Sequence, residues 1–194
     1  MKRSLIIMVK EPRPGRVKTR LGRDIGVIPA TWWFRHQSAR LIRSLRDPRW
    51  QIVLAVAPDR AVASKVWPAD LPRQPQGGGD LGQRMKRALS GLAAGRKGPV
   101  CLIGADIPGI SRAHIARAFA ALGEHDAVFG PAEDGGYWLV GAKHPARLPQ
   151  TLFENSRWST EHALADALRT LPGWRIALTD ILRDVDTAAD LPQA

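Results

Sequence analysis

The 194-residue sequence lacks the residues from which several kinds of site are built. Its single cysteine, Cys101, excludes an intramolecular disulfide and leaves no zinc motif. The five histidines show no metal-ligand spacing, and no Gly-x-Ser-x-Gly element marks a serine hydrolase. Because Cys101 stands in the apolar run 100–103, we expect a buried core thiol in a reducing compartment.

Long apolar runs are missing as well. Residues 5–9 are apolar, but Lys10, Glu11 and Pro12 end this run after five residues. Such a run is too short for a signal-peptide core or a membrane span. We therefore expect no membrane span and a cytoplasmic location.

Acidic residues are scarce relative to basic ones. The chain has 18 Asp and Glu against 29 Lys and Arg, which gives a formal net charge of +11. This excess favours anionic partners: nucleotides, phosphorylated metabolites, nucleic acid or an acidic membrane surface. The dense cationic tail that is common in nucleic-acid-binding arms is missing, which disfavours nucleic acid.

Short β-type runs alternate with helical patterns, as is typical of α/β proteins. The patterns predict strands over residues 4–9, 52–57, 100–104, 127–130, 137–141 and 174–178. They predict helices over 29–45, 59–67 and 161–171, and two more that Asp80 and Ser111 cap, with a loop over 10–28. No repeat or composition shift divides the chain. We predict one α/β domain over 1–194, with a mainly parallel mixed sheet flanked by helices.

A basic loop after the first strand is the first candidate for chemistry. Five cations lie within eleven positions: Lys10, Arg13, Arg16, Lys18 and Arg20. A loop at the carboxyl end of a strand can surround phosphates with charged side chains and backbone N–H groups. The loop follows neither the P-loop pattern nor the Rossmann glycine fingerprint. A solvated basic loop is the alternative.

Asp106 is the second candidate, because it ends the apolar run 102–105 and precedes Ile107 and Pro108. A carboxylate at the end of a buried strand lies where open α/β sheets bind ligands. Its oxygens suit Mg²⁺ or Mn²⁺, which would offset the negative charge that builds up as a nucleotide reacts. An ordinary turn is the alternative.

An acidic, glycine-rich segment is the third candidate. It contains Asp134, Gly135, Gly136 and Tyr137, and its two glycines let the backbone approach a ligand closely. Its carboxylate could join a metal or a substrate hydroxyl, or the segment could be a simple turn.

Gly79 and Asp80 open a helix whose free N–H groups could face an anion or a base, although capping alone would explain Asp80. Near the carboxyl end, Asp184 and Asp186 offer two more carboxylates, for which a turn is the favoured interpretation.

Five motifs in this order resemble those of a known family. They are Lys10-x-Pro12-x-Pro14-Gly15-x-x-Lys18-Thr19-Arg20-Leu21, Gly79-Asp80-Leu81-Gly82-Gln83-Arg84-Met85, Ile103-Gly104-Ala105-Asp106-Ile107-Pro108, Gly130-Pro131-x-x-Asp134-Gly135-Gly136-Tyr137-x-Leu139-x-Gly141 and Asp184-x-Asp186-Thr187. The series resembles small bacterial transferases of the GT-A, or nucleotide-diphospho-sugar transferase, fold. These include arsenosugar-type and radical-SAM/selenodomain-associated glycosyltransferases. More distantly, the chain is similar to phospholactate guanylyltransferases and molybdenum-cofactor nucleotidyltransferases.

The resemblance implies a nucleotide site at the ends of the sheet, where Lys10, Lys18 and Arg20 would hold phosphates. It implies Asp106 as the ligand of Mg²⁺ or Mn²⁺, and Asp134 beside the acceptor or sugar. Asp106 lacks the partner of an Asp-x-Asp pair, since Gly104 stands two residues before it. We predict as catalytic Asp106, Asp134 and Lys18, and as substrate-binding Lys10, Arg13, Arg20, Gly79, Asp80, Gly135, Gly136 and Tyr137.

These patterns favour a metal-assisted transferase that uses a nucleotide-activated donor, with a nucleotide sugar as the first choice and a small molecule as acceptor. The nearest alternative is a nucleotidyltransferase that joins an NTP to a phosphorylated acceptor and releases pyrophosphate. A nucleic-acid-binding protein and an inactive nucleotide-binding scaffold are further alternatives. The first two share one requirement: the cations of the basic loop and Asp106 must face the same polyphosphate.

Overall fold

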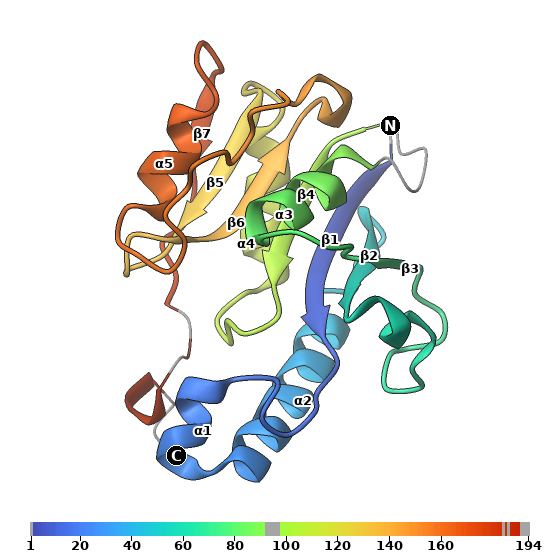
Figure 1. Cartoon of the computed structure of the whole chain (residues 1–194). Helices are drawn as coiled ribbons and strands as arrows, with labels where there is room; N and C mark the ends of the chain where they lie inside the picture. The colour runs from blue at the N-terminus through green and yellow to red at the C-terminus, as the bar shows by residue number, and fades with distance from the viewer. Residues whose placement is uncertain (1, 92–97, 184, 186, 191–194) are drawn as a thin grey trace.

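Seven strands form one sheet between two layers of helices in the computed structural model, which describes residues 2–91, 98–183, 185 and 187–190 (Figure 1). The strands are β1 (Arg3–Lys10), β2 (Trp50–Ala57), β3 (Arg73–Pro75), β4 (Val100–Gly104), β5 (Ala127–Pro131), β6 (Tyr137–Ala142) and β7 (Ile176–Leu178). Their order across the sheet is β3-β2-β1-β4-β6-β5-β7. The predicted α/β fold is confirmed.

Strand β6 interrupts an otherwise parallel sheet. β1 pairs in parallel with β2 and β4, β2 with β3, and β5 with β7. β6 is antiparallel to both of its neighbours, β4 and β5. The strands predicted over 127–130 and 137–141 are thus antiparallel neighbours, and the acidic segment connects β5 to β6.

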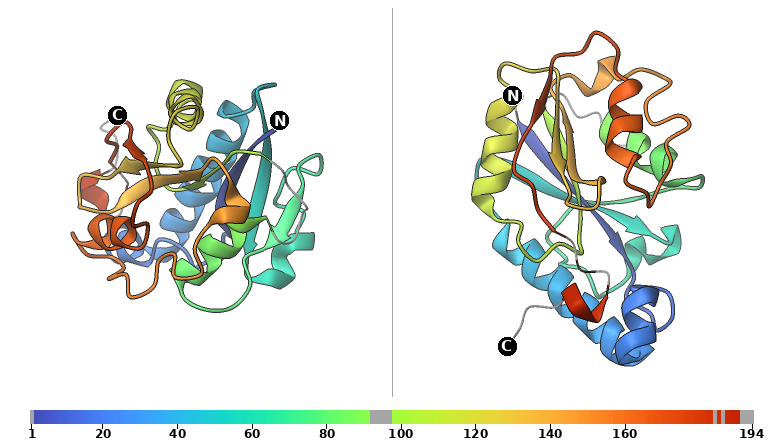
Figure 2. Two further views of the ribbon diagram at one scale, coloured as in Figure 1. Left: turned by 90° about the horizontal axis from the view of Figure 1, so that it is seen from above. Right: turned by 90° about the vertical axis from the view of Figure 1, so that its left-hand side faces the viewer.

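The helices cover both faces of the sheet (Figure 2). They are α1 (Thr19–Ile25), α2 (Val27–Ser44), α3 (Leu81–Ser90), α4 (Arg112–Ala121) and α5 (Ala163–Arg169), with the 3₁₀ helices η1 (Asp59–Ala63), η2 (Pro145–Arg147) and η3 (Ala188–Asp190). Leu5 and Ile7 of β1 belong to the core shared with α2 and α4, whereas Ile6 belongs to the core shared with α3 and α5. This burial of both faces explains why β1 is continuously apolar.

Four segments differ from the prediction. Residues 19–25 form α1 instead of a loop, because only Leu21 and Gly22 of this short basic helix are buried and leave little periodic signal. Residues 59–67 form only the five-residue η1, and the helix predicted over 161–171 is limited to α5. Strand β3 was not predicted, since three residues at a sheet edge carry almost no pattern.

None of the helices in the described ranges combines the length and apolarity that crossing a bilayer requires.

Candidate functional site

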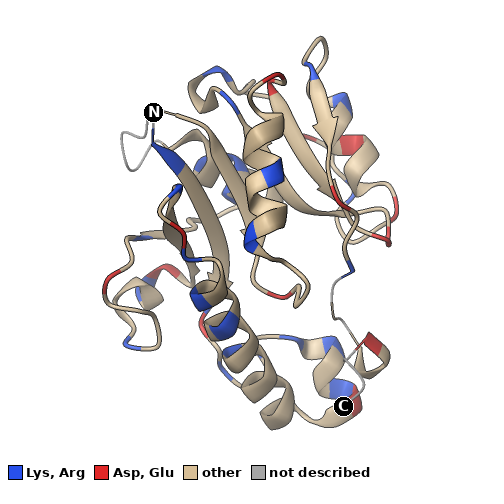
Figure 3. Cartoon of the chain, turned by 180° about the vertical axis from the view of Figure 1, so that it is seen from behind, with Lys and Arg blue, Asp and Glu red and all other residues tan. Residues whose placement is uncertain are grey.

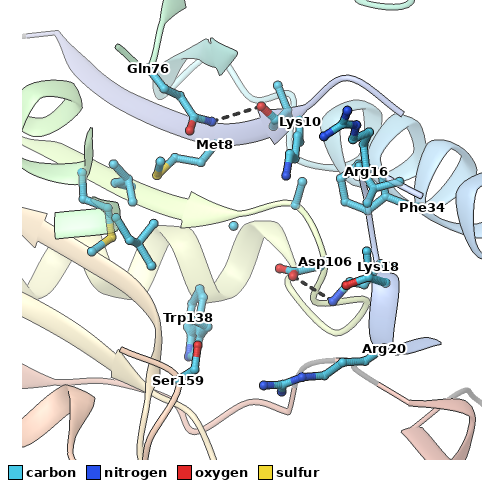
Figure 4. Close-up of a pocket in the computed structure, with 18 of the residues that line it drawn as sticks. Met8, Lys10, Arg16, Lys18, Arg20, Phe34, Gln76, Asp106, Trp138 and Ser159 are labelled. Carbon is cyan, nitrogen blue, oxygen red and sulfur yellow. Dashed lines mark hydrogen bonds and ion pairs between the residues drawn. The ribbon is translucent and has the colours of Figure 1, made fainter. Parts of the chain in front are cut away.

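A cavity of about 660 Å³ opens at the carboxyl ends of β1 and β4 (Figure 4). The charged residues that line it are Lys10, Arg16, Lys18, Arg20 and Asp106. The first four come from the loop after β1 and the start of α1, and the carboxylate follows β4. The basic loop and Asp106 thus share one cavity, as the sequence predicts.

Lys18 connects three separate parts of the chain. Its Nζ donates to Asp106 Oδ2 at 2.9 Å and to the Val185 carbonyl oxygen at 2.6 Å. The Lys18 backbone is left-handed (φ 44°), and only 7% of its side chain is exposed. A buried ammonium needs such partners, because desolvating an unpaired charge is costly. Lys18 therefore fixes Asp106 and the carboxyl-terminal segment in place.

Asp106 keeps one oxygen available. Its side chain is 37% exposed, and Oδ1 has no hydrogen-bond donor within the described residues. A Cβ atom at Gly104 would lie 2.8 Å from Oδ1, so a glycine there lets the carboxylate turn back over the end of β4. Lys18 holds the carboxylate from one side, which leaves Oδ1 for a ligand.

The donor set around Asp106 decides how a metal could bind. The described residues contain no group of three or more His, Cys, Asp or Glu side chains that could enclose an ion, and Asp184 and Asp186 lie outside the described residues. Mg²⁺ is commonly bound by one or two carboxylates with phosphate oxygens and waters completing its shell. Asp106 fits an ion that is shared with substrate phosphates.

Lys10 and Arg16 lie between the central cavity and an adjoining groove of about 790 Å³, because both residues line the two spaces. Neither forms an ion pair within the described part of the chain, in contrast to Arg13, which pairs with Glu11 at 2.6 Å. Arg13 lines only the groove. Figure 4 shows the Lys10 and Arg16 side chains approaching each other above Asp106.

Asp134 and Gly136 lie at a smaller pocket of about 340 Å³ that joins the central cavity through Arg20, Asp106 and Tyr137. Asp134 Oδ1 accepts a hydrogen bond from the Gly136 N–H at 2.9 Å, which shapes the turn. The acidic segment is therefore brought to the same site as the basic loop.

Gly135 does not line either space and has a packing role instead. Its φ is +82°, and a Cβ atom there would lie 2.3 Å from the Glu161 carbonyl oxygen. Its own carbonyl accepts from the Leu164 N–H at 3.1 Å. Gly135 is thus the residue that lets the acidic turn rest against the start of α5.

Gly79 and Asp80 do not line the central cavity. Asp80 Oδ1 accepts from the Gln83 N–H at 2.8 Å, and Gln83 Oε1 accepts from the Asp80 N–H at 3.1 Å. This reciprocal capping box begins α3 and accounts for Asp80.

Tyr137 contributes an apolar wall. Its ring lies 5.2 Å from Phe129 and 6.3 Å from Phe153, centroid to centroid. The hydroxyl is buried without a hydrogen-bond partner in the described residues, and burial raises the pKa of the phenol. Tyr137 therefore stays protonated and is unsuited to be a base.

Arg16, from the basic loop that the sequence offers as a candidate, lines the cavity although it is not among the predicted substrate-binding residues, and Gln76 was not predicted at all. Gln76 Nε2 donates to the carbonyls of Val9 at 3.1 Å and Ala55 at 2.9 Å, which ties β1 to β2 below the cavity. Gln76 follows β3, whose three residues give no signal that a strand ends before it.

Comparison with known proteins places this site in a family. Residues 41–160 match the model of the bacterial family DUF2064, described as uncharacterized protein conserved in bacteria. The chain belongs to the DUF2064 family. No curated protein matches this DUF2064 chain in sequence.

Solved structures resemble this DUF2064 chain over nearly its full length. A candidate nucleotide-diphospho-sugar transferase from Desulfovibrio desulfuricans G20 is 28% identical, with a TM-score of 0.83, covering 96% of this chain and 84% of its own. The 4-diphosphocytidyl-2C-methyl-D-erythritol synthase of Anaerococcus prevotii DSM 20548 is 10% identical, with a TM-score of 0.60 over 97% and 94%. A manganese complex of Rv0371c from Mycobacterium tuberculosis H37Rv is 13% identical, with a TM-score of 0.58 over 98% and 96%. At 10% and 13% identity, the synthase and the Rv0371c structures show only that the fold is shared.

Proposed function

We propose that this chain is a metal-assisted transferase that takes a glycosyl group from a nucleotide sugar and passes it to a small-molecule acceptor. The observation that carries the proposal is the convergence of four cations and Asp106 on one cavity at the carboxyl ends of β1 and β4. The candidate nucleotide-diphospho-sugar transferase with a TM-score of 0.83 supports the same class of donor.

The cavity suits a diphosphate in size and charge. Its volume of about 660 Å³ lies within the range of small-molecule sites. Lys10 and Arg16 have no carboxylate partner in the described residues, so a ligand phosphate would meet cations that are not already neutralised. Arg20 lies at the passage to the smaller pocket, where a leaving diphosphate would separate from the transferred group.

Asp106 and Lys18 act as a unit. Asp106 Oδ1, together with the donor phosphates, would hold Mg²⁺ or Mn²⁺, and such an ion neutralises charge on a leaving diphosphate. Lys18 positions Asp106 through the 2.9 Å contact. The manganese complex of the Mycobacterium tuberculosis neighbour supports a divalent ion in this fold.

The smaller pocket suits the acceptor. Asp134 lies there with the hydroxyl-bearing Ser159 and Thr160 and with the indole of Trp158. In the transfer, an acceptor oxygen bonds to the anomeric carbon while the bond from that carbon to the diphosphate oxygen breaks. The acceptor proton passes to the Asp134 carboxylate, and the electron pair leaves with the nucleoside diphosphate.

The test is a screen of UDP-, GDP-, CDP-, ADP- and dTDP-sugars with Mg²⁺ or Mn²⁺, read first by thermal shift and then by chromatography of the released nucleotide. We expect at least one nucleotide sugar to raise the melting temperature and to be consumed with an acceptor, releasing a nucleoside diphosphate. The Asp106→Asn variant should lose turnover, and Asp70→Asn, which changes an exposed carboxylate paired with Arg46, should retain it. Failure of all nucleotides to bind would reject the proposal.

Nucleotidyl transfer is the second candidate, because four cations against one carboxylate would also suit a triphosphate. This reaction would release pyrophosphate from an NTP instead of a nucleoside diphosphate from a sugar nucleotide. Measuring both products in the same screen separates the two reactions.

A further inference from the structure

A separate cavity of about 350 Å³ lies between α2 and the segment that follows η1. One wall is a stripe along α2, which consists of Phe34, Arg35, Ser38, Ala39, Ile42 and Arg43. These residues recur every four positions and so lie on one face of the helix. Residues 65–68 form the opposite wall, and Pro12 closes one end. Phe34 also lines the central cavity, so the two spaces share this side chain.

The body of this cavity is apolar and held in place by the fold. Trp67 is 5% exposed, and its indole Nε1 donates to the Ala61 carbonyl at 3.1 Å, which fixes the ring. Ile42 and Phe34 are buried core residues on the opposite side. A preformed apolar cavity of this volume is at the lower end of the range for small-molecule sites.

The rim carries charge of one sign. Arg35, Arg43 and Lys65 line the cavity, and none of the described residues that line it carries a carboxylate. None of the three forms an ion pair within the described part of the chain. Blue segments along α2 mark part of this charge in Figure 3.

Ser38 adds a polar group to the α2 wall. It is 2% exposed, and its Oγ has no hydrogen-bond partner in the described residues. The Oγ atom itself is buried, so it lies within the wall and does not face a ligand in the cavity. The cavity therefore offers an apolar interior and a cationic rim.

We propose that this cavity binds a small amphipathic anion, in which an aliphatic chain or a single ring carries one carboxylate or a similar acidic head. The apolar part would lie against Trp67 and Ile42, and the head would lie at the rim near Arg35 and Arg43. The site does not depend on the function proposed above, because Phe34 is the one residue that the two cavities have in common.

Calorimetric titration with octanoate, octan-1-ol and octylammonium tests the charge requirement, because the three probes share one chain and differ in the head. We expect octanoate to bind at one site per chain, octan-1-ol to bind about fivefold more weakly, and octylammonium not to bind, since each exposed ion pair adds only a modest factor. Equal affinity for octanoate and octan-1-ol, or no octanoate binding, would overturn the proposal.

Variants locate the probe. Ala39→Phe places a ring in the cavity from an exposed helix position and should abolish octanoate binding with little change in melting temperature. Arg43→Gln should weaken binding about two- to fivefold. Arg40→Gln is the matched control, because Arg40 lies on α2 outside the cavity, and it should leave the affinity unchanged. Octanoate binding that survives Ala39→Phe, or that is lost in Asp106→Asn, would place the probe elsewhere and reject the site.

Discussion

The basic loop after β1 and the acidic turn between β5 and β6 are both charged and rich in turn residues, but the fold uses them differently. Lys10 and Arg16 of the loop reach the central cavity on long side chains and remain without ion-pair partners among the described residues. In the turn, Asp134 Oδ1 accepts from the Gly136 backbone, and Gly135 packs against Glu161. The loop supplies groups for a ligand, whereas much of the turn maintains its own shape.

The basic loop is itself divided. Arg13 pairs with Glu11, and Lys18 pairs with Asp106, so these two cations have protein partners. Lys10 and Arg16 have no such partner among the described residues, although they belong to the same eleven-residue stretch. A cation count therefore overstates the number of groups that are available to hold phosphate.

The largest effect is expected at Asp106. Asp106→Asn removes the charge that would hold a metal and the carboxylate that pairs with the buried Lys18 ammonium. Loss of one group that stabilises developing charge typically costs about 10²- to 10³-fold in kcat, and we expect a loss in this range. Steady-state turnover of the nucleotide sugar identified in the screen measures it.

Asp134→Asn sharpens the comparison between the two regions. If Asp134 is the base that accepts the acceptor proton, the kcat of the Asp134→Asn variant should fall. The affinity of this variant for the nucleotide, measured by calorimetry, should stay within twofold of wild type. A variant with full kcat would limit Asp134 to shaping the turn. Circular dichroism of Asp106→Asn and Asp134→Asn verifies that both variants retain the fold.

Gly135→Ala should be the most destabilising change in the acidic turn. The new Cβ would meet the Glu161 backbone at 2.3 Å, and the residue would have to keep a φ of +82°. Strain at such a φ and overpacking each cost about 1–3 kcal/mol, so we expect the free energy of unfolding to fall by about 3 kcal/mol. Urea denaturation measures this change.

Gly15→Ala is the matched control in the basic loop. Its φ is +71°, but a Cβ there would meet no atom within 4 Å. Only the backbone strain remains, so a smaller loss, about 1 kcal/mol, is expected. Equal losses in the two variants would show that the contact with Glu161 is not what makes Gly135 necessary.

Lys10→Gln and Arg16→Gln should each weaken nucleotide binding about tenfold, because a charge-assisted hydrogen bond to phosphate contributes about 1.5–3 kcal/mol. Arg13→Gln removes the same charge from the same loop, but Arg13 already pairs with Glu11, so its effect should stay within about twofold. Calorimetric dissociation constants at fixed ionic strength compare the three. An Arg13 effect as large as that of Arg16 would contradict the division of the loop.

Particular residues show which parts of the fold and of the site can be predicted from the sequence. The apolar run of β1 and the position of Asp106 after β4 carry strong local patterns, so the sheet and the place of the cavity were predictable. Contacts between distant segments were not, because no local pattern encodes the bond from Lys18 to Asp106, 88 positions away. For the same reason, the sequence places Lys18 among the candidate phosphate ligands without revealing its hydrogen bond to Asp106.

Asp80 and Gly135 show the opposite limit. A cap or a packed turn uses the same residue types as a ligand site, since both need small or short polar side chains near free backbone groups. The 2.8 Å contact from the Gln83 N–H to Asp80 shows that Asp80 caps a helix. The close approach of Glu161 to Gly135 shows that Gly135 has a packing role. The residue types alone do not distinguish these structural roles from ligand binding.

The smallest predicted effect concerns pH and the segment beside the acceptor pocket. Asp166 accepts hydrogen bonds from the Arg157 side chain and backbone, which hold the pKa of its carboxyl well below the usual range. Because the folded-state pKa is lowered, this stabilisation is present above the unfolded-state pKa of about 4 and is lost as the pH falls through the folded-state value. Between pH 4 and pH 2 the melting temperature of wild type should therefore fall more steeply than that of Asp166→Asn.

Asp70→Asn is the control. Asp70 pairs with Arg46 but is 61% exposed, so solvent screens this ion pair. The melting temperature of Asp70→Asn should therefore fall with pH about as steeply as that of wild type. If Asp166→Asn keeps the wild-type slope, the Arg157 contacts do not hold the segment that carries Ser159 and Thr160 against α5.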